Sequence, residues 1–204
     1  MSIITLNNLS INRSDTASSG QVWTATSATA ADFQAAGIIE EIDMWAPTAD
    51  AQNFTTIGVN DASSDLTVAR HSGSNFTHKG TGMSTNNTYW TFPSTGYWYV
   101  SLKAQWRLEG TASCRGMTSR IDVSTDGGSS FNDNYGLSML AIHTFDSNND
   151  FGSTDATCVI DVDNVSNVKV RGFYTSANAS NEIDMSHDEA DQSCGWTFIK
   201  LRGV

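Results

Sequence analysis

Two acidic segments contain residue types that could hold a metal ion. In DSNNDFGSTD, residues 146–155, Asp146, Asn148 and Asp150 are spaced two apart, as the oxygen ligands of calcium often are. The glycine comes one position late for an EF-hand loop and the bidentate glutamate is missing, so a polar surface loop is the preferred interpretation. The acidic run EIDMSHDEADQ, residues 182–192, is typical of a solvated loop. We therefore predict no metal site and no cofactor, and calcium binding by either segment stays open.

The sequence contains none of the common catalytic or nucleotide-binding motifs. No HExxH pair, GxSxG elbow, P-loop or dinucleotide-binding fingerprint is present. The histidines are dispersed along the chain: His71, His78, His143 and His187. General acid–base chemistry needs groups within hydrogen-bond reach of one another, and an enzyme would require carboxylates that converge in a cleft. We predict a non-enzymatic protein with no catalytic residues.

Residues 124–131, STDGGSSF, match the S-x-D-x-G-x-[ST]-[WF] pattern of the Asp box, which occurs in sialidases and other propellers. The structural role of such a segment is a β-hairpin turn, in which Asp126 bonds nearby backbone while Gly127 and Gly128 take positive φ. A propeller would repeat the box in successive blades, and this chain of 204 residues has a single copy. A turn is therefore favoured over a glycosidase.

The cysteines and the net charge exclude several kinds of partner. Three cysteines, Cys114, Cys158 and Cys194, are odd in number and lack CxxC spacing, so we expect buried free thiols. A formal net charge of -11 repels phosphate backbones and anionic headgroups. We therefore expect that the protein binds neither nucleic acid nor a membrane. The chain also lacks an apolar run of membrane-spanning length and the pattern of a signal peptide, so we expect a soluble protein that is not classically secreted.

The first part of the chain, residues 1–36, is small and polar with isolated apolar anchors. Ser27 followed by ATAADFQAAG predicts a short capped helix that ends at Gly37. Scattered anchors hardly offset the conformational entropy of ordering such a segment, so we expect an extended docking arm that lies against a partner or a neighbouring subunit. Its predicted docking residues are Ile3, Ile4, Leu6, Leu9, Ile11, Val22 and Trp23.

The rest of the chain, residues 37–204, has the pattern of an all-β domain. Short segments rich in Val, Ile, Thr and aromatic residues alternate with Gly, Asn, Asp and Ser clusters, which favours a two-sheet sandwich or barrel. The predicted strands are 38–45, 54–59, 65–70, 87–92, 97–107, 118–125, 137–145, 156–162, 167–174 and 195–202. Strands 137–145 and 195–202 carry apolar residues on both faces, so we expect each to be covered twice, by the core and by another chain.

Three motifs resemble the jelly-roll domain shared by tumour necrosis factor and the complement globular heads. They are YWTFPSTGYWYV (89–100), VIDVD (159–163) leading into VKV (168–170), and the closing WTFIKL (196–201). The resemblance covers roughly residues 54–204. It implies a two-sheet jelly-roll sandwich.

The resemblance also implies what the strand 97–107 contacts. Trp98, Val100, Leu102, Ala104 and Trp106 alternate onto one side of that strand, which predicts a core face. In the family the other face lies against neighbouring subunits around a threefold axis, so the implied trimer interface contains Tyr97, Tyr99, Ser101 and Lys103. A solvent-exposed sheet face is the alternative.

The function implied is structural, because a collagen-like stalk, an anchor and a signal peptide are lacking and similar jelly rolls occur as trimeric fibre, knob and decoration domains of virus particles. We expect a homotrimer in a bacteriophage virion that decorates the capsid or forms part of the tail, attached to capsid or tail proteins through residues 1–36. The alternative is a receptor- or carbohydrate-binding module for a host surface glycan, with Trp23, Trp45 and Trp90 as candidate sugar platforms. Head or tail location and the host stay open.

Overall fold

A computed structural model describes most of the chain in two compact units, Met1–Ile38 and Ile39–Val204. The described residues are 3–6, 9–12, 21–27, 30–35, 39–48, 51–52, 56–59, 66–71, 78–86, 88–108, 114–142, 150–177, 181–183 and 194–201. These residues form strands, turns and bends without a helix, so the described part holds no helix that could cross a membrane.

The unit Met1–Ile38 contains a small sheet. Its strands are β1 (Ile3–Leu6), β2 (Leu9–Asn12), β3 (Gln21–Ser27) and β4 (Ala30–Ala35), in the order β1-β2-β4-β3. The strands β2 and β4 run parallel, and the other two pairs are antiparallel. The predicted docking residues therefore lie on paired strands: Ile3, Ile4 and Leu6 on β1, Leu9 and Ile11 on β2, and Val22 and Trp23 on β3.

The short helix predicted after Ser27 is wrong, because residues 30–35 form β4. This strand pairs with β2 on one side and with β3 on the other, and its register sets Trp23 opposite Phe33. Backbone hydrogen bonds to two neighbours outweigh the helix propensity of an alanine-rich segment, which is only a weak preference.

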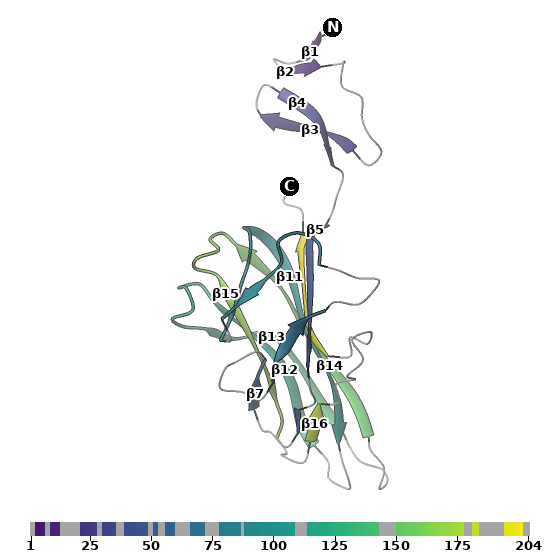
Figure 1. Cartoon of the computed structure of the whole chain (residues 1–204), viewed down its shortest axis with the longest axis vertical. Helices are drawn as coiled ribbons and strands as arrows, with labels where there is room; N and C mark the ends of the chain where they lie inside the picture. The colour runs from purple at the N-terminus through teal and green to yellow at the C-terminus, as the bar shows by residue number, and fades with distance from the viewer. Residues whose placement is uncertain are drawn as a thin grey trace. The chain divides into compact units, whose positions relative to one another are not determined.

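The unit Ile39–Val204 consists of two antiparallel sheets, which confirms the predicted all-β jelly-roll sandwich (Figure 1). One sheet has the order β6-β16-β11-β17-β5-β8, with β14 also paired to β11; the other has the order β13-β12-β15-β10-β9, with β7 paired to β15. The bounds are β5 (Ile39–Pro47), β6 (Ala51–Gln52), β7 (Thr56–Gly58), β8 (Val68–Arg70), β9 (Ser84–Thr85), β10 (Trp90–Thr91), β11 (Gly96–Leu108), β12 (Cys114–Ser124), β13 (Asn132–Ile142), β14 (Asp150–Val162), β15 (Lys169–Thr175), β16 (Asn181–Ile183) and β17 (Gly195–Leu201). The start of β5 and the end of β17 are partners, since Ile39 pairs with Leu201.

The core lies between the two sheets and is rich in aromatic side chains. The predicted core face of β11 is confirmed: Trp98, Val100, Leu102, Ala104 and Trp106 are each 0% exposed. Across the sandwich, Gly172 of β15 leaves room for Trp196 and Leu102, because a Cβ there would be 2.3 Å from Trp196 Cζ2. The two sheets therefore approach each other closely at a residue without a side chain.

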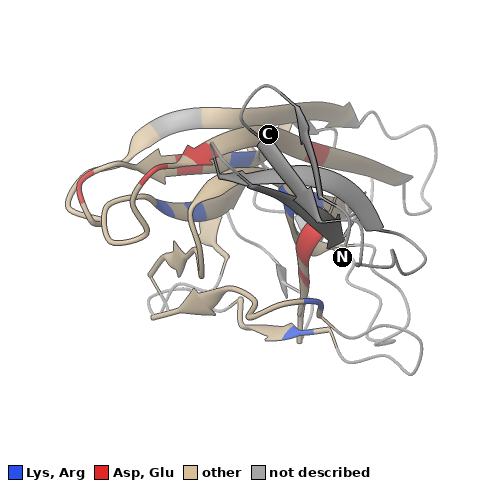
Figure 2. Cartoon of the chain, turned by 90° about the horizontal axis from the view of Figure 1, so that it is seen from above, with Lys and Arg blue, Asp and Glu red and all other residues tan. Residues whose placement is uncertain are grey.

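The outward face of the β12–β15 pair carries an ion cluster. The pairing sets Asp122 opposite Arg171, and Asp122 is 0% exposed. Its carboxylate is 3.1 Å from Arg120 Nε and 3.3 Å from Arg171 Nε, while the Arg171 guanidinium lies 4.2 Å from the centroid of the Phe131 ring. Basic and acidic residues thus lie close to one another on the described strands (Figure 2), which lets a carboxylate be covered without an uncompensated charge.

The turn between β12 and β13 confirms the structural interpretation of the Asp box. Gly127 and Gly128 have φ of 77° and 94°, and Asp126 Oδ1 accepts hydrogen bonds from the Ser124 hydroxyl (2.8 Å) and the Ser130 backbone N–H (2.9 Å). A hydrogen bond from the Ser130 hydroxyl to Asp126 Oδ2, together with these two bonds, lowers the pKa of Asp126 from 3.8 to about 2. The carboxylate is therefore part of the hairpin turn.

Candidate self-association surface

The predicted trimer-interface residues lie together on the face of β11 that points away from the core. Tyr97 is 50% exposed, Tyr99 is half-buried, Lys103 is exposed and Ser101 is only 8% exposed. The face continues onto β14 and β17, which pair with β11 on opposite sides.

Four apolar side chains form a row across this face, one from each of four neighbouring strands. Tyr99 of β11 pairs with Val159 of β14 and with Ile199 of β17, and Ile199 pairs with Ile42 of β5. Val159 is 51% exposed, and the other three are half-buried. We call these residues, Val159, Tyr99, Ile199 and Ile42, the apolar row.

Beside the apolar row the face becomes polar. The Ser101 hydroxyl donates a 2.5 Å hydrogen bond to Asp155 Oδ1, so this side chain is already engaged within the protomer. Lys103 pairs with Asp155 across the β11–β14 ladder. The Lys103 carbonyl accepts a 2.6 Å hydrogen bond from the hydroxyl of Tyr174, a residue of the other sheet. Burial holds the pKa of Tyr174 well above its usual value, so the hydroxyl keeps its proton and fixes this part of β11 against the core.

Sequence reasoning missed three members of the apolar row: Val159, Ile199 and Ile42. One signal was available for Ile199, since residues 195–202 carry apolar side chains on both faces. Val159 and Ile42 could not be assigned to the row, because membership depends on which strands are neighbours and in which register they pair. Both facts require the topology.

A second exposed apolar surface lies on β13. Its alternate residues Tyr135, Leu137 and Met139 are 51%, 51% and 66% exposed, and we call them the β13 ladder. The register places Leu137 beside Arg120 and Met139 beside Thr118 of β12. This strand was expected to be covered on both faces, and on the protomer its outward side chains are open.

The other candidate sites of the sequence analysis are only partly described. Asp150 belongs to β14, where it pairs with Leu108, whereas Asp146, Asn148 and residues 184–192 lie outside the described residues. His143 and His187 also lie outside them. Among the residues that the structure describes, no three or more His, Cys, Asp or Glu side chains are grouped as metal ligands would be.

The described cysteines and tryptophans bear on two further expectations. Cys158 is half-buried and Cys194 buried, neither forms a disulfide, and burial raises the pKa of Cys158 to about 11. The Cys114 side chain lies outside the described set. Trp90 is 0% exposed, and Trp45 is half-buried with its indole N–H donated to Asp43 at 3.0 Å. The Trp23 side chain is likewise outside the described set. Neither described candidate therefore offers an open ring to a sugar.

Comparison with known proteins gives a likeness of fold. No protein-family model matches the chain, and no curated protein matches its sequence. The structure of murine APRIL at pH 5.0 has a TM-score of 0.50 at 9% identity, covering 79% of this chain and 98% of that one. The fold is a tumour-necrosis-factor-like jelly roll. Murine APRIL at pH 8.5 (TM-score 0.45, 10% identity, 79% and 98% coverage) and Eiger TNF from S. frugiperda (0.43, 7%, 80% and 93%) are further matches.

The jelly-roll likeness at these identities extends to the fold alone. A widely shared fold does not carry function with it, so the role of the chain has to be argued from its surfaces.

Proposed function

We propose that the chain is a non-enzymatic structural protein of a bacteriophage particle, a homotrimer attached through residues 1–36 to capsid or tail proteins. The observation that carries the proposal is a pair of unlike apolar surfaces on one protomer, the apolar row on the β11–β14–β17 face and the β13 ladder. Large exposed apolar side chains gathered on one strand or across one sheet face mark interaction sites more often than free surface.

The two surfaces suit a closed ring of identical copies. A contact between unlike surfaces is heterologous, and it closes into a ring when the rotation between neighbours divides a full turn. The apolar row of one copy would pack against the β13 ladder of the next, and Tyr97 and Tyr99 would bury ring area while keeping their hydroxyls available for hydrogen bonds. Three copies close the ring in the resembled fold.

The proposed attachment role of residues 1–36 is supported by the division of the chain into two compact units. Met1–Ile38 forms a unit separate from the sandwich, with its own paired strands. Three weakly binding segments on one trimer act at high effective concentration, so avidity offsets a modest affinity of each segment. The particle would gain a firmly held module from contacts that are individually weak.

The test separates assembly from attachment. The full chain and a chain lacking residues 1–36 are compared for molar mass in solution by light scattering, and for co-sedimentation with phage particles that lack the endogenous protein. We expect trimers from both chains and co-sedimentation of the full chain only. A monomeric full chain would refute the trimer, and particle binding by the truncated chain would refute the docking role.

A further inference from the structure

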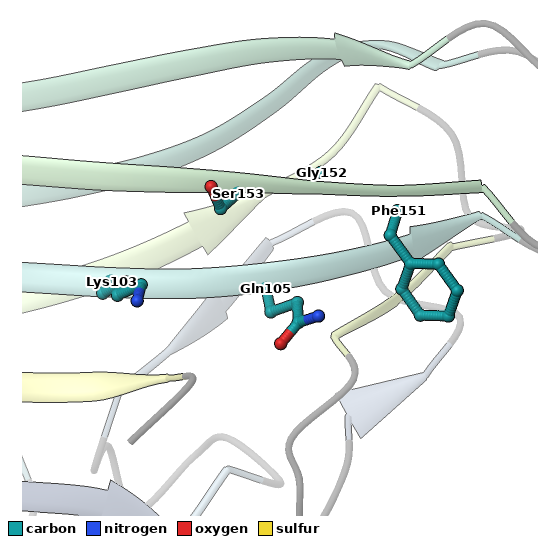
Figure 3. Close-up of a pocket in the computed structure, with 5 residues that line it drawn as sticks. All are labelled: Lys103, Gln105, Phe151, Gly152 and Ser153. Atoms are coloured by element: carbon teal, nitrogen blue, oxygen red, sulfur yellow. The ribbon is translucent and has the colours of Figure 1, made fainter. Parts of the chain in front are cut away.

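A shallow depression of about 350 Å³ lies at the polar end of the β11–β14 face (Figure 3). It is lined by Lys103, Gln105, Phe151, Gly152 and Ser153. Lys103 and Gln105 come from β11, the other three come from β14, and the ladder pairs Gln105 with Ser153. A second depression of about 230 Å³ shares Lys103 and includes Ser101, Asp155 and Thr197 in its lining. The two hollows lie on either side of one lysine.

We propose that this depression binds a neutral saccharide, a role that goes beyond the structural function proposed above. Phe151 is 54% exposed, and Figure 3 shows its ring on the same side of the strands as the Lys103 and Gln105 side chains. The C–H face of a pyranose is apolar and packs on such a ring, while its hydroxyls need donors and acceptors at the ring edge.

The polar groups of the lining supply both donors and acceptors. Gln105 offers an amide, Ser153 a hydroxyl and Lys103 an ammonium group. In the part of the chain that the structure describes, neither the Lys103 ammonium nor the Gln105 amide is bonded to another side chain, so both are available to a ligand. The backbone beneath them is fixed, because the Gln105 N–H donates to Cys194 Sγ at 3.0 Å.

Charge favours a neutral ligand over an anionic one. Lys103 is the one charged residue among the lining residues that the structure describes, and the carboxylate of its ladder neighbour Asp155 belongs to the adjoining depression, so charges of both signs lie at this end of the face. The whole chain has a formal net charge of -11, which repels sulfated, sialylated or phosphorylated ligands as they approach. A purely apolar ligand would leave the amide and the ammonium group desolvated without partners.

The site lies apart from the apolar row. Phe151 and Val159 are eight residues apart on β14, which corresponds to about 26 Å along the strand. Lys103 lies between the two, four residues from Tyr99 on β11, so the predicted interface reaches the edge of the depression while Phe151 lies beyond it. Phe151 therefore reports on saccharide binding and Val159 on trimer formation.

The experiment uses the full chain and an array of neutral oligosaccharides, with sialylated and sulfated glycans as comparison probes. The best neutral probe is then titrated against the wild type and the variants Phe151→Ala, Gln105→Ala and Phe131→Ala by saturation-transfer NMR and calorimetry. Phe131 is the matched control, a half-buried phenylalanine that lies outside the depression, the apolar row and the β13 ladder.

We expect Phe151→Ala to weaken binding by at least about tenfold, Gln105→Ala by a smaller factor, and Phe131→Ala to have no effect on binding. The molar mass and unfolding midpoint of Phe151→Ala should match those of the wild type, because an exposed ring adds little to the fold. Four results would overturn the proposal: no neutral glycan bound, a preference for anionic glycans, equal losses in Phe151→Ala and Phe131→Ala, or dissociation of the oligomer by Phe151→Ala, which would make Phe151 a subunit contact.

Discussion

Arg70 donates two hydrogen bonds to the carboxylate of Asp43, from Nε to Oδ1 at 2.9 Å and from Nη2 to Oδ2 at 3.1 Å. The same carboxylate accepts the Met83 backbone N–H at 2.7 Å and the Trp45 indole N–H at 3.0 Å, and Asp43 is 0% exposed. One buried side chain therefore ties β5 to β8 and to the segment that leads into β9.

Removing this carboxylate should destabilise the sandwich strongly. Asp43→Ala leaves the Met83 N–H and the Trp45 N–H without their acceptor and Arg70 without its counter-charge, which we expect to cost about 3 kcal/mol in the free energy of unfolding. Urea unfolding followed by tryptophan fluorescence measures this change. Asp163→Ala, which removes an exposed carboxylate of equal charge, serves as the control. A loss below about 1 kcal/mol for Asp43→Ala would contradict this account.

Two glycine-to-alanine substitutions should have opposite outcomes. The added Cβ of Gly172→Ala would lie 2.3 Å from Trp196 Cζ2 and 2.7 Å from Leu102 Cδ2, so the sheets must move apart, at an expected cost of about 1 to 3 kcal/mol. Among the residues that the structure describes, the Cβ of Gly116→Ala would meet only Ala177 Cβ, at 3.4 Å. We expect Gly116→Ala to be neutral or slightly stabilising, because alanine restricts the unfolded chain. The measurement is the midpoint temperature of thermal unfolding of the two variants. Equal midpoints would show that the core tolerates the extra methyl group.

The turn carboxylate Asp126 should make stability depend on pH in the acidic range. Its pKa is about 2 in the folded protein against 3.8 ordinarily, so its contribution is complete above the ordinary pKa and is lost as the pH falls towards 2. The wild type should therefore be more stable than Asp126→Asn at pH 7, and the difference should shrink between about pH 4 and pH 2. Denaturant titrations at several pH values test this. A difference that stays constant over the range would mean that the charge of Asp126 does not stabilise the turn.

A charge in the apolar row should separate the subunits without unfolding them. Val159 is 51% exposed on the protomer, so Val159→Glu costs the isolated fold little, whereas it places an unpaired carboxylate in a desolvated contact. We expect a monomer by light scattering with an unchanged circular dichroism spectrum. Ser166→Glu adds the same charge in an exposed turn and should remain trimeric. If both variants stay trimeric, the contact lies elsewhere.

The sequence predicted the existence of the strands in the sandwich better than it predicted their first residues. Residues 156–162 were recognised from Cys158, Ile160 and Val162, yet β14 begins at Asp150. Its polar first half pairs with β11 from Lys103 to Leu108, and these backbone hydrogen bonds do not depend on side-chain polarity. The same cause makes β4 a strand despite its alanines.

The candidate surface was predictable only along a single strand. Alternation in residues 97–107 places Tyr97 and Tyr99 on the face away from the core, because successive side chains of a strand point to opposite faces. The neighbours of Tyr99 depend on pairing with residues 60 and 100 positions later in the chain, Val159 and Ile199. Phe151 was missed for the same reason, since it lies in a segment that was interpreted as a surface loop.

The pairing of Ile39 with Leu201 decides where foreign peptides would be displayed on this protein. A tag joined after β17 would emerge beside Ile39, the residue with which β5 begins. An insertion between Leu108 and Cys114 would instead extend from the far end of β11, about 33 Å from the Trp98–Lys200 pair. Epitopes or affinity ligands grafted there would be displayed at the opposite end of β11 from the Ile39–Leu201 pair.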